Sequence, residues 1–126
     1  MHKSEINPMP PNFAKYINLV SDIELAQAFA GSVRQLNELD KNLLHSLADK
    51  RYADGKWTVK EILQHLADSD RIMSYQALML ARKDPTVLQG FDETLHVQNA
   101  NAARRTIDDL IAEIKNCAGR DESFIR

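Results

Sequence analysis

The chain has 126 residues, of which 44% are hydrophobic and 27% are charged, and it holds only four glycines and four prolines. This composition excludes a disordered, collagen-like or low-complexity chain and predicts a single folded domain over residues 1–126. Sixteen lysines and arginines against eighteen aspartates and glutamates give a net charge of -2. Because binding to a phosphate backbone needs a basic excess, we expect no nucleic-acid partner.

The cysteine content and the apolar segments bear on the compartment. The lone cysteine, Cys117, has no second cysteine for an internal disulfide or a cysteine-based zinc site, which suits a reducing compartment. No segment approaches the roughly eighteen consecutive apolar residues of a membrane span, and the N-terminal residues lack the pattern of a signal or transit peptide. We predict a cytoplasmic protein with no membrane partner.

The first helical pattern follows a lead-in that is predicted to be extended over residues 1–20. Three of the four prolines, Pro8, Pro10 and Pro11, fall in this lead-in, and proline fixes φ and disfavours helix. From Asp22, apolar residues recur at three- and four-residue spacing and predict a long helix from about 22 to 48, although Asp40 falls on the stripe. The stripe consists of Ala26, Phe29, Val33, Leu36, Leu43 and Leu47.

A second long helix is predicted from about 58 to 83. An Asp-Gly turn precedes it, Thr58 and Glu61 have the spacing of a capping box, and Asp84-Pro85 ends it. Its core face is predicted to consist of Val59, Ile62, Leu66, Met73, Ala77 and Leu80.

The remaining sequence predicts a short surface helix within residues 92–105 and then a third long helix. Thr106 and Asp109 form a second cap at its start. Its apolar face is predicted to consist of Ile107, Leu110, Ile111, Ile114, Cys117, Ala118 and Ile125.

These elements predict an all-α, up-and-down helical bundle, since no alternating strand pattern or internal repeat is present. The number of long helices is odd for such a bundle, and the third helix reaches Arg126 within an apolar pattern. We therefore expect a fourth helix to be absent from the chain. Two explanations stay open: a second copy completes the bundle, or the sequence is a fragment of a longer product.

His65 is the strongest candidate for a functional histidine. It lies on the second predicted helix, at the margin of the apolar stripe, where a metal or substrate can reach an imidazole at the edge of a cleft. Asp68, one turn further on, is expected to orient it. A packed, hydrogen-bonded histidine is the alternative, because a catalytic zinc site uses about three protein ligands.

The other histidines have weaker claims. His2 lies in the N-terminal segment and His45 on the predicted solvent face of the first helix, so neither is given a role. His96 lies in the polar segment and is a weak candidate.

Three further features have structural interpretations. Cys117 is interpreted as a small buried hydrophobe and Trp57 as an apolar anchor for the turn before the second helix. Charge pairs such as Glu113 and Lys115 are interpreted as a solvated surface.

The segment from Tyr52 to Asp68 resembles part of the DinB-like superfamily, also called the YfiT-like metal-dependent hydrolases. It reads Tyr-Ala-Asp-Gly-Lys-Trp-Thr and continues into a helix that carries His-Leu-Ala-Asp. The likeness extends through Tyr75, residues 81–86 and Gly90-Phe91-Asp92, and covers the chain from Tyr16 to about Phe124. The resemblance implies a domain of the DinB/YfiT four-helix type that lacks its last helix.

The resemblance also implies a divalent metal, zinc or nickel, held by three histidines. His65 matches the first of them, with Asp68 as a hydrogen-bond acceptor beside it. No His-x-x-x-His pair follows Ile107 and no histidine follows His96, so the implied site is incomplete in this chain. Gln76 stands where relatives often have arginine, which puts an anion-binding role there in doubt.

The implied function is that of a metal-dependent hydrolase or a low-molecular-weight thiol transferase, with a small thiol and an electrophilic substrate as partners. A metal with an open position would stabilise a thiolate or hydroxide near neutral pH. The alternative is a non-catalytic helical module that has lost the complete metal site and self-associates as a homodimer. Its interface is predicted on the third helix, at Leu110, Ile111, Ile114, Ala118 and Ile125.

Overall fold

The computed structural model describes the backbone of residues 1–125 and the side chains of residues 1–117. These residues form helices and turns with no β-strand, which confirms the all-α class. In chain order the elements are η1 (Lys3–Glu5), α1 (Ala14–Ile17), α2 (Leu25–Glu38), α3 (Lys41–Leu47), α4 (Val59–Ala81), α5 (Glu93–Asn99), η2 (Ala102–Arg104) and α6 (Ile107–Ile125). Within the described residues, every helix is too short or too polar to span a lipid bilayer.

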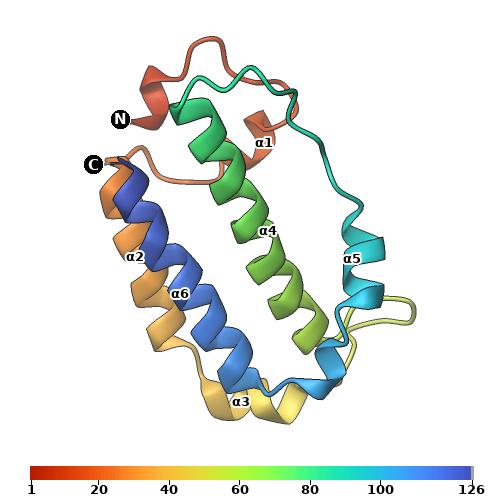
Figure 1. Cartoon of the computed structure of the whole chain (residues 1–126). Helices are drawn as coiled ribbons and strands as arrows, with labels where there is room; N and C mark the ends of the chain where they lie inside the picture. The colour runs from red at the N-terminus through yellow and green to blue at the C-terminus, as the bar shows by residue number, and fades with distance from the viewer. Residues whose placement is uncertain (126) are drawn as a thin grey trace.

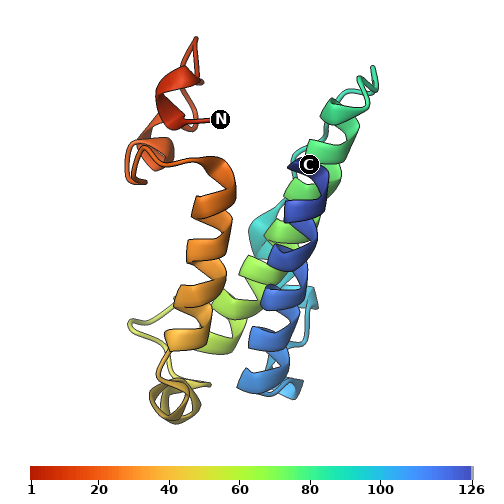
Figure 2. The same ribbon diagram turned by 90° about the vertical axis from the view of Figure 1, so that its left-hand side faces the viewer.

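Helix α6 is the central element of the bundle. It packs against α4 on one side and against α2 on the other, as Figures 1 and 2 show. Its residues Ile107, Leu110 and Ile111 are the largest fully buried side chains, each at most 1% exposed. The three-residue and four-residue spacing of these side chains places them on one face, so the predicted apolar face of the third long helix is confirmed at these positions.

The first long helix is interrupted, and the prediction of one continuous helix over 22–48 is wrong. Leu39 leaves the helical conformation, and the Asp40 carboxylate accepts a hydrogen bond from the backbone N–H of Leu43 at 3.0 Å. An aspartate that bonds to a nearby backbone N–H favours a helix start over a helix interior. The polar residue that interrupts the apolar stripe is therefore the N-cap of α3.

Helix α4 begins where the sequence predicts. The backbone N–H of Glu61 donates to the Thr58 hydroxyl at 3.1 Å, and the N–H of Thr58 donates to the Glu61 carboxylate at 2.7 Å. This capping box satisfies two backbone donors that no helical bond can reach. It fixes the first turn of α4 and with it the positions of the candidate residues that follow.

The buried face of α4 differs from the predicted one. Leu63 and Ala67 pack into the core with the apolar residues of α6, and Gln64 is buried beside them. The predicted core face is largely exposed, with exposed fractions of 36% for Ile62, 46% for Leu66, 49% for Met73 and 66% for Leu80. At 100° per residue, these two faces lie roughly 100° apart. Both have helical spacing, and spacing alone does not say which one meets a neighbouring helix.

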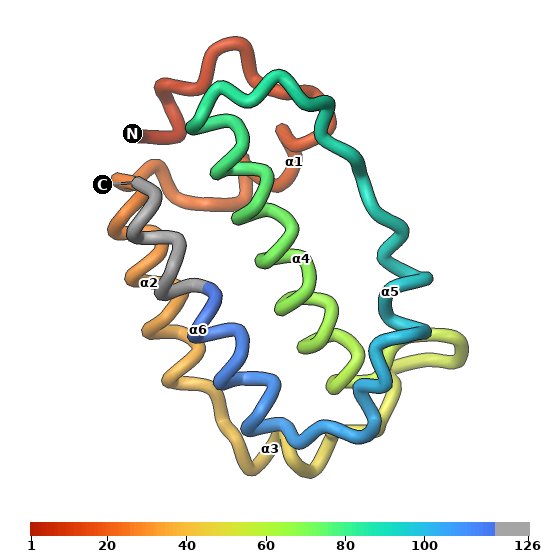
Figure 3. The backbone as a smooth tube through the Cα atoms, viewed as in Figure 1, coloured from red at the N-terminus to blue at the C-terminus, as the bar shows by residue number. Residues whose placement is uncertain are grey.

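Two connecting segments also differ from expectation. The lead-in over residues 1–20 is not uniformly extended, because it contains η1 and α1, and Pro10 accepts the backbone bonds that start α1. The chain between α4 and α5 runs back alongside α4, as Figure 3 shows. Helix α5 is the predicted short helix, but Val97 on it and Ala102 on η2 are buried, so this segment covers α4 rather than lying wholly at the surface.

Candidate functional site

His65 lies in the second turn of α4, where it is half-buried. Its ring packs against Trp57, with 5.0 Å between the ring centroids and an angle of 50° between the planes. Its Nδ1 lies 3.4 Å from the hydroxyl oxygen of Ser69, one turn further along the helix. These two contacts hold the imidazole in one orientation.

Asp68 has different partners from the one that the sequence suggests. Its Oδ1 accepts a hydrogen bond from Nε2 of Gln64 at 3.0 Å, and Arg71 lies 3.9 Å from the same oxygen. The polar side chain beside the His65 ring nitrogen is that of Ser69. Spacing of four residues on a helix is the signal for this pair, since side chains at i and i+4 lie one above the other.

Two pockets lie beside the strip of α4 that carries His65. The first, of about 370 Å³, is lined by Tyr52, Gly55, Lys56, Trp57, Ile62 and Thr94. The second, of about 430 Å³, is lined by Gln64, Asp68, Leu95, His96, Asn99 and Ala100. Around the helix axis, His65 falls between Ile62 of the first pocket and Asp68 of the second, and α5 contributes to both.

The second pocket brings together two of the sequence candidates, Asp68 and His96. The His96 ring also packs against Phe91, with centroids 5.1 Å apart. The remaining histidines lie elsewhere: His45 forms an ion-pair contact of 3.2 Å with Asp108 and links α3 to α6, and His2 lies 4.0 Å from Asp22.

The described residues do not fit a complete zinc or nickel site. Among them, no three histidine, cysteine, aspartate or glutamate side chains come together as possible metal ligands. Cys117 is 7% exposed and lies on the buried face of α6, as predicted. Since a catalytic zinc uses about three protein ligands, His65 accounts for only one of them here.

Comparison with known proteins identifies the family. A family model described as the DinB superfamily matches residues 24–126. The chain belongs to the DinB superfamily. No curated protein and no solved structure matches it. The match begins at Glu24, the N-cap of α2, so the DinB-superfamily region includes α2 through α6 and excludes η1 and α1.

A polar network joins α4 to α6 in this DinB-superfamily domain. Arg105 donates to Gln64 at 2.9 Å and to one carboxylate oxygen of Glu113, while Arg71 pairs with the other oxygen. The Glu113 side chain is only 12% exposed, so its interpretation as part of a solvated surface is wrong. Sequence reasoning missed the network because its members look like ordinary surface residues on α4, on α6 and in the segment before α6.

The pKa of Glu113 reflects two opposing effects. Burial alone would raise the pKa of this carboxyl group, but the hydrogen bond and charge of Arg105, together with the charge of Arg71, outweigh it. The folded-state pKa therefore lies below the ordinary value of 4.5. At pH values above its ordinary pKa, such a carboxylate contributes fully to the stability of the fold. That contribution is lost as the pH falls through the folded-state pKa.

We expect Glu113→Gln to reduce the acid sensitivity of the fold. The free energy of unfolding of the native protein should fall as the pH drops below about 4.5, and the variant should lose less over the same range while being less stable at neutral pH. Urea denaturation followed by circular dichroism between about pH 3 and pH 7 measures this. The control is Glu38→Gln, which removes an exposed carboxylate at the end of α2. Identical pH profiles for the native protein and Glu113→Gln would contradict the assignment.

Proposed function

We propose that this DinB-superfamily domain is a metalloprotein of the metal-dependent hydrolase or low-molecular-weight thiol transferase class, with His65 as a metal ligand. The observation that supports the proposal is the placement of His65 within the segment that carries the family resemblance, fixed between Trp57 and Ser69. Because Ser69 contacts Nδ1, the metal would bind Nε2. The proposal requires further ligands from outside the described side chains or from a second copy.

The substrates that go with this proposal are a small thiol and an electrophile. The two pockets beside the His65 strip, of about 370 and 430 Å³, are in the size range of small-molecule sites. We also propose a cytoplasmic location, where low-molecular-weight thiols and the Cys117 thiol both stay reduced.

Metal content per chain tests the role of His65. Purified, untagged protein should hold about one zinc or nickel ion per site, and His65→Ala should lose it because no neighbouring imidazole replaces the ligand. Plasma mass spectrometry gives the metal content, with His45→Ala and His96→Ala as matched controls that should keep it. Native protein that is free of metal, or metal that is unaffected by His65→Ala, would contradict the proposal.

We propose in addition that the protein forms a homodimer through α4. The face predicted from the sequence is not available, because Leu110, Ile111 and Ile114 are buried within the chain; Ala118 and Ile125 lie outside the described side chains. The exposed row on α4 supports the proposal instead. Its large members are Leu66, Met73 and Leu80, and the exposed Ala77 lies among them. The half-buried Ser69 and Gln76 border the row on one side, and Asp70 borders it on the other. An exposed row of large apolar side chains commonly marks an interface, and two copies related by a two-fold axis would bury it.

Met73→Lys should convert the dimer to a monomer, because it places a charge in the middle of this row. The matched control is Tyr75→Lys, an exposed residue on the same helix that lies roughly 160° away from Met73 around the axis. Light scattering coupled to size-exclusion chromatography at micromolar concentration gives the mass of each. Native protein that elutes as a clean monomer, or an equal effect of both substitutions, would count against the dimer.

A further inference from the structure

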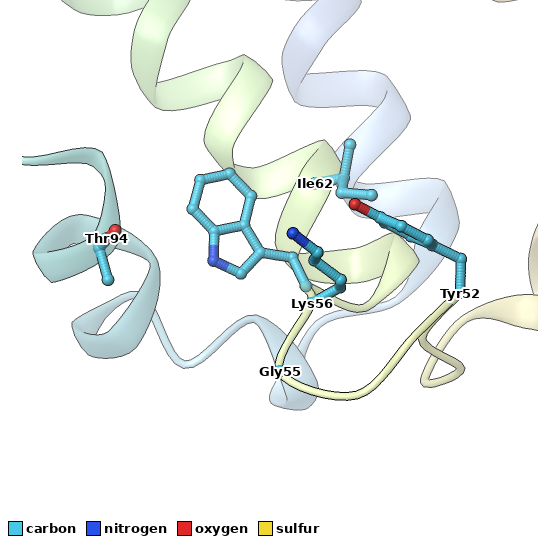
Figure 4. Close-up of a pocket in the computed structure, with 6 residues that line it drawn as sticks. Tyr52, Gly55, Lys56, Ile62 and Thr94 are labelled. Atoms are coloured by element: carbon cyan, nitrogen blue, oxygen red, sulfur yellow. The ribbon is translucent and has the colours of Figure 1, made fainter.

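The pocket in front of the first turn of α4 combines an aromatic wall with an accessible cation. Trp57 is half-buried, contacts the His65 ring and lines the pocket together with Ile62. Figure 4 shows the Lys56 side chain on the same side of the pocket as Tyr52, with Thr94 of α5 on the far side. The lining of the pocket therefore combines apolar surface from Trp57 and Ile62 with one charged amine and two hydroxyl groups.

The pocket carries the positive charge of Lys56. Of the residues whose side chains the structure describes, those that line the pocket include no acidic one to pair with that charge. Among the described residues, Lys56 forms no ion pair, whereas the nearby Lys60 pairs with Asp49 at 3.2 Å. Of the acidic side chains near Lys56 in sequence, Asp54 does not line the pocket, and Glu61 is occupied by the N–H of Thr58 and by Arg51 at 3.3 Å. An anionic group is thus the natural partner of the Lys56 amine.

We infer that this pocket binds a small aromatic carboxylate. The aromatic ring of the ligand packs against the Trp57 indole, and its carboxylate accepts a charge-assisted hydrogen bond from the Lys56 amine. Tyr52 and Thr94 also line the pocket, and each carries a hydroxyl group that can donate to a carboxylate oxygen. A volume of about 370 Å³ accommodates a single-ring ligand. The inference does not depend on a metal at His65.

Trp57 is the single tryptophan of the chain, so tryptophan emission comes from this pocket and the His65 ring beside it. The probes are benzoate and its neutral counterpart benzamide, added to protein from which metal has been removed with a chelator. Benzoate should cause a saturable change in emission, with an affinity roughly tenfold higher than that of benzamide because only benzoate carries the charge that Lys56 recognises. Equal affinities, or a change that does not saturate, would overturn the inference.

A pair of lysine variants locates the charge. Lys56→Met should abolish the preference for benzoate over benzamide while leaving the benzamide response in place, because the aromatic wall is retained. Lys50→Met removes an exposed lysine that does not line the pocket and should leave the preference unchanged. Both side chains are exposed, so circular dichroism should show an intact fold for each. A preference for benzoate that survives Lys56→Met would overturn the assignment of the cation.

Discussion

Burial of one face of α6 is the interaction on which the rest of the structure depends. Ile107, Leu110 and Ile111 are removed from water almost completely, and full burial of such a side chain stabilises a fold by about 1.5–3 kcal/mol. Helices α2 and α4 both pack on α6 (Figure 2). The position of α4, and therefore of every candidate residue on it, is set by this contact.

The polar network fixes how α4 is rotated against α6. Gln64 is buried between Leu63 and Ala67 and receives a hydrogen bond from Arg105, which also pairs with Glu113. Rotating α4 by one residue would withdraw Gln64 from Arg105 and leave buried polar groups without partners, which is costly. This rotation also places His65, around the axis of α4, between the residues that line the two pockets, and it leaves Leu66, Met73 and Leu80 exposed.

The sequence predicts the local features of this fold well because they depend on neighbouring residues. A single segment of sequence contains the capping box at Thr58, the helix that it starts and the motif around His65. The family match confirms the resemblance that this motif indicates. The break at Asp40 also has a local signal, since an aspartate on an apolar stripe is a good N-cap. The contact between Ser69 and His65 likewise follows from helical spacing.

The buried face of α4, the surroundings of Glu113 and the pocket at Lys56 depend on which helices pack together. Local sequence patterns do not predict that packing. Helix α4 carries apolar residues on two faces, and only the neighbouring α6 decides that Leu63 is buried and Leu66 is not. Glu113 looks like a surface carboxylate until Arg71 and Arg105 are brought to it from other parts of the chain. The pocket at Lys56 joins the turn before α4 to Thr94 of α5, which local patterns also leave open.

The stability of two alanine variants of α4 tests this account most directly. Leu63→Ala and Leu66→Ala make the same chemical change three residues apart on one helix. In dilute protein, urea denaturation should show a cost of about 2–5 kcal/mol for Leu63→Ala, which opens a cavity against α6, and less than about 1 kcal/mol for the exposed Leu66→Ala. A larger cost for Leu66→Ala than for Leu63→Ala would contradict the packing of α4 on α6 described here.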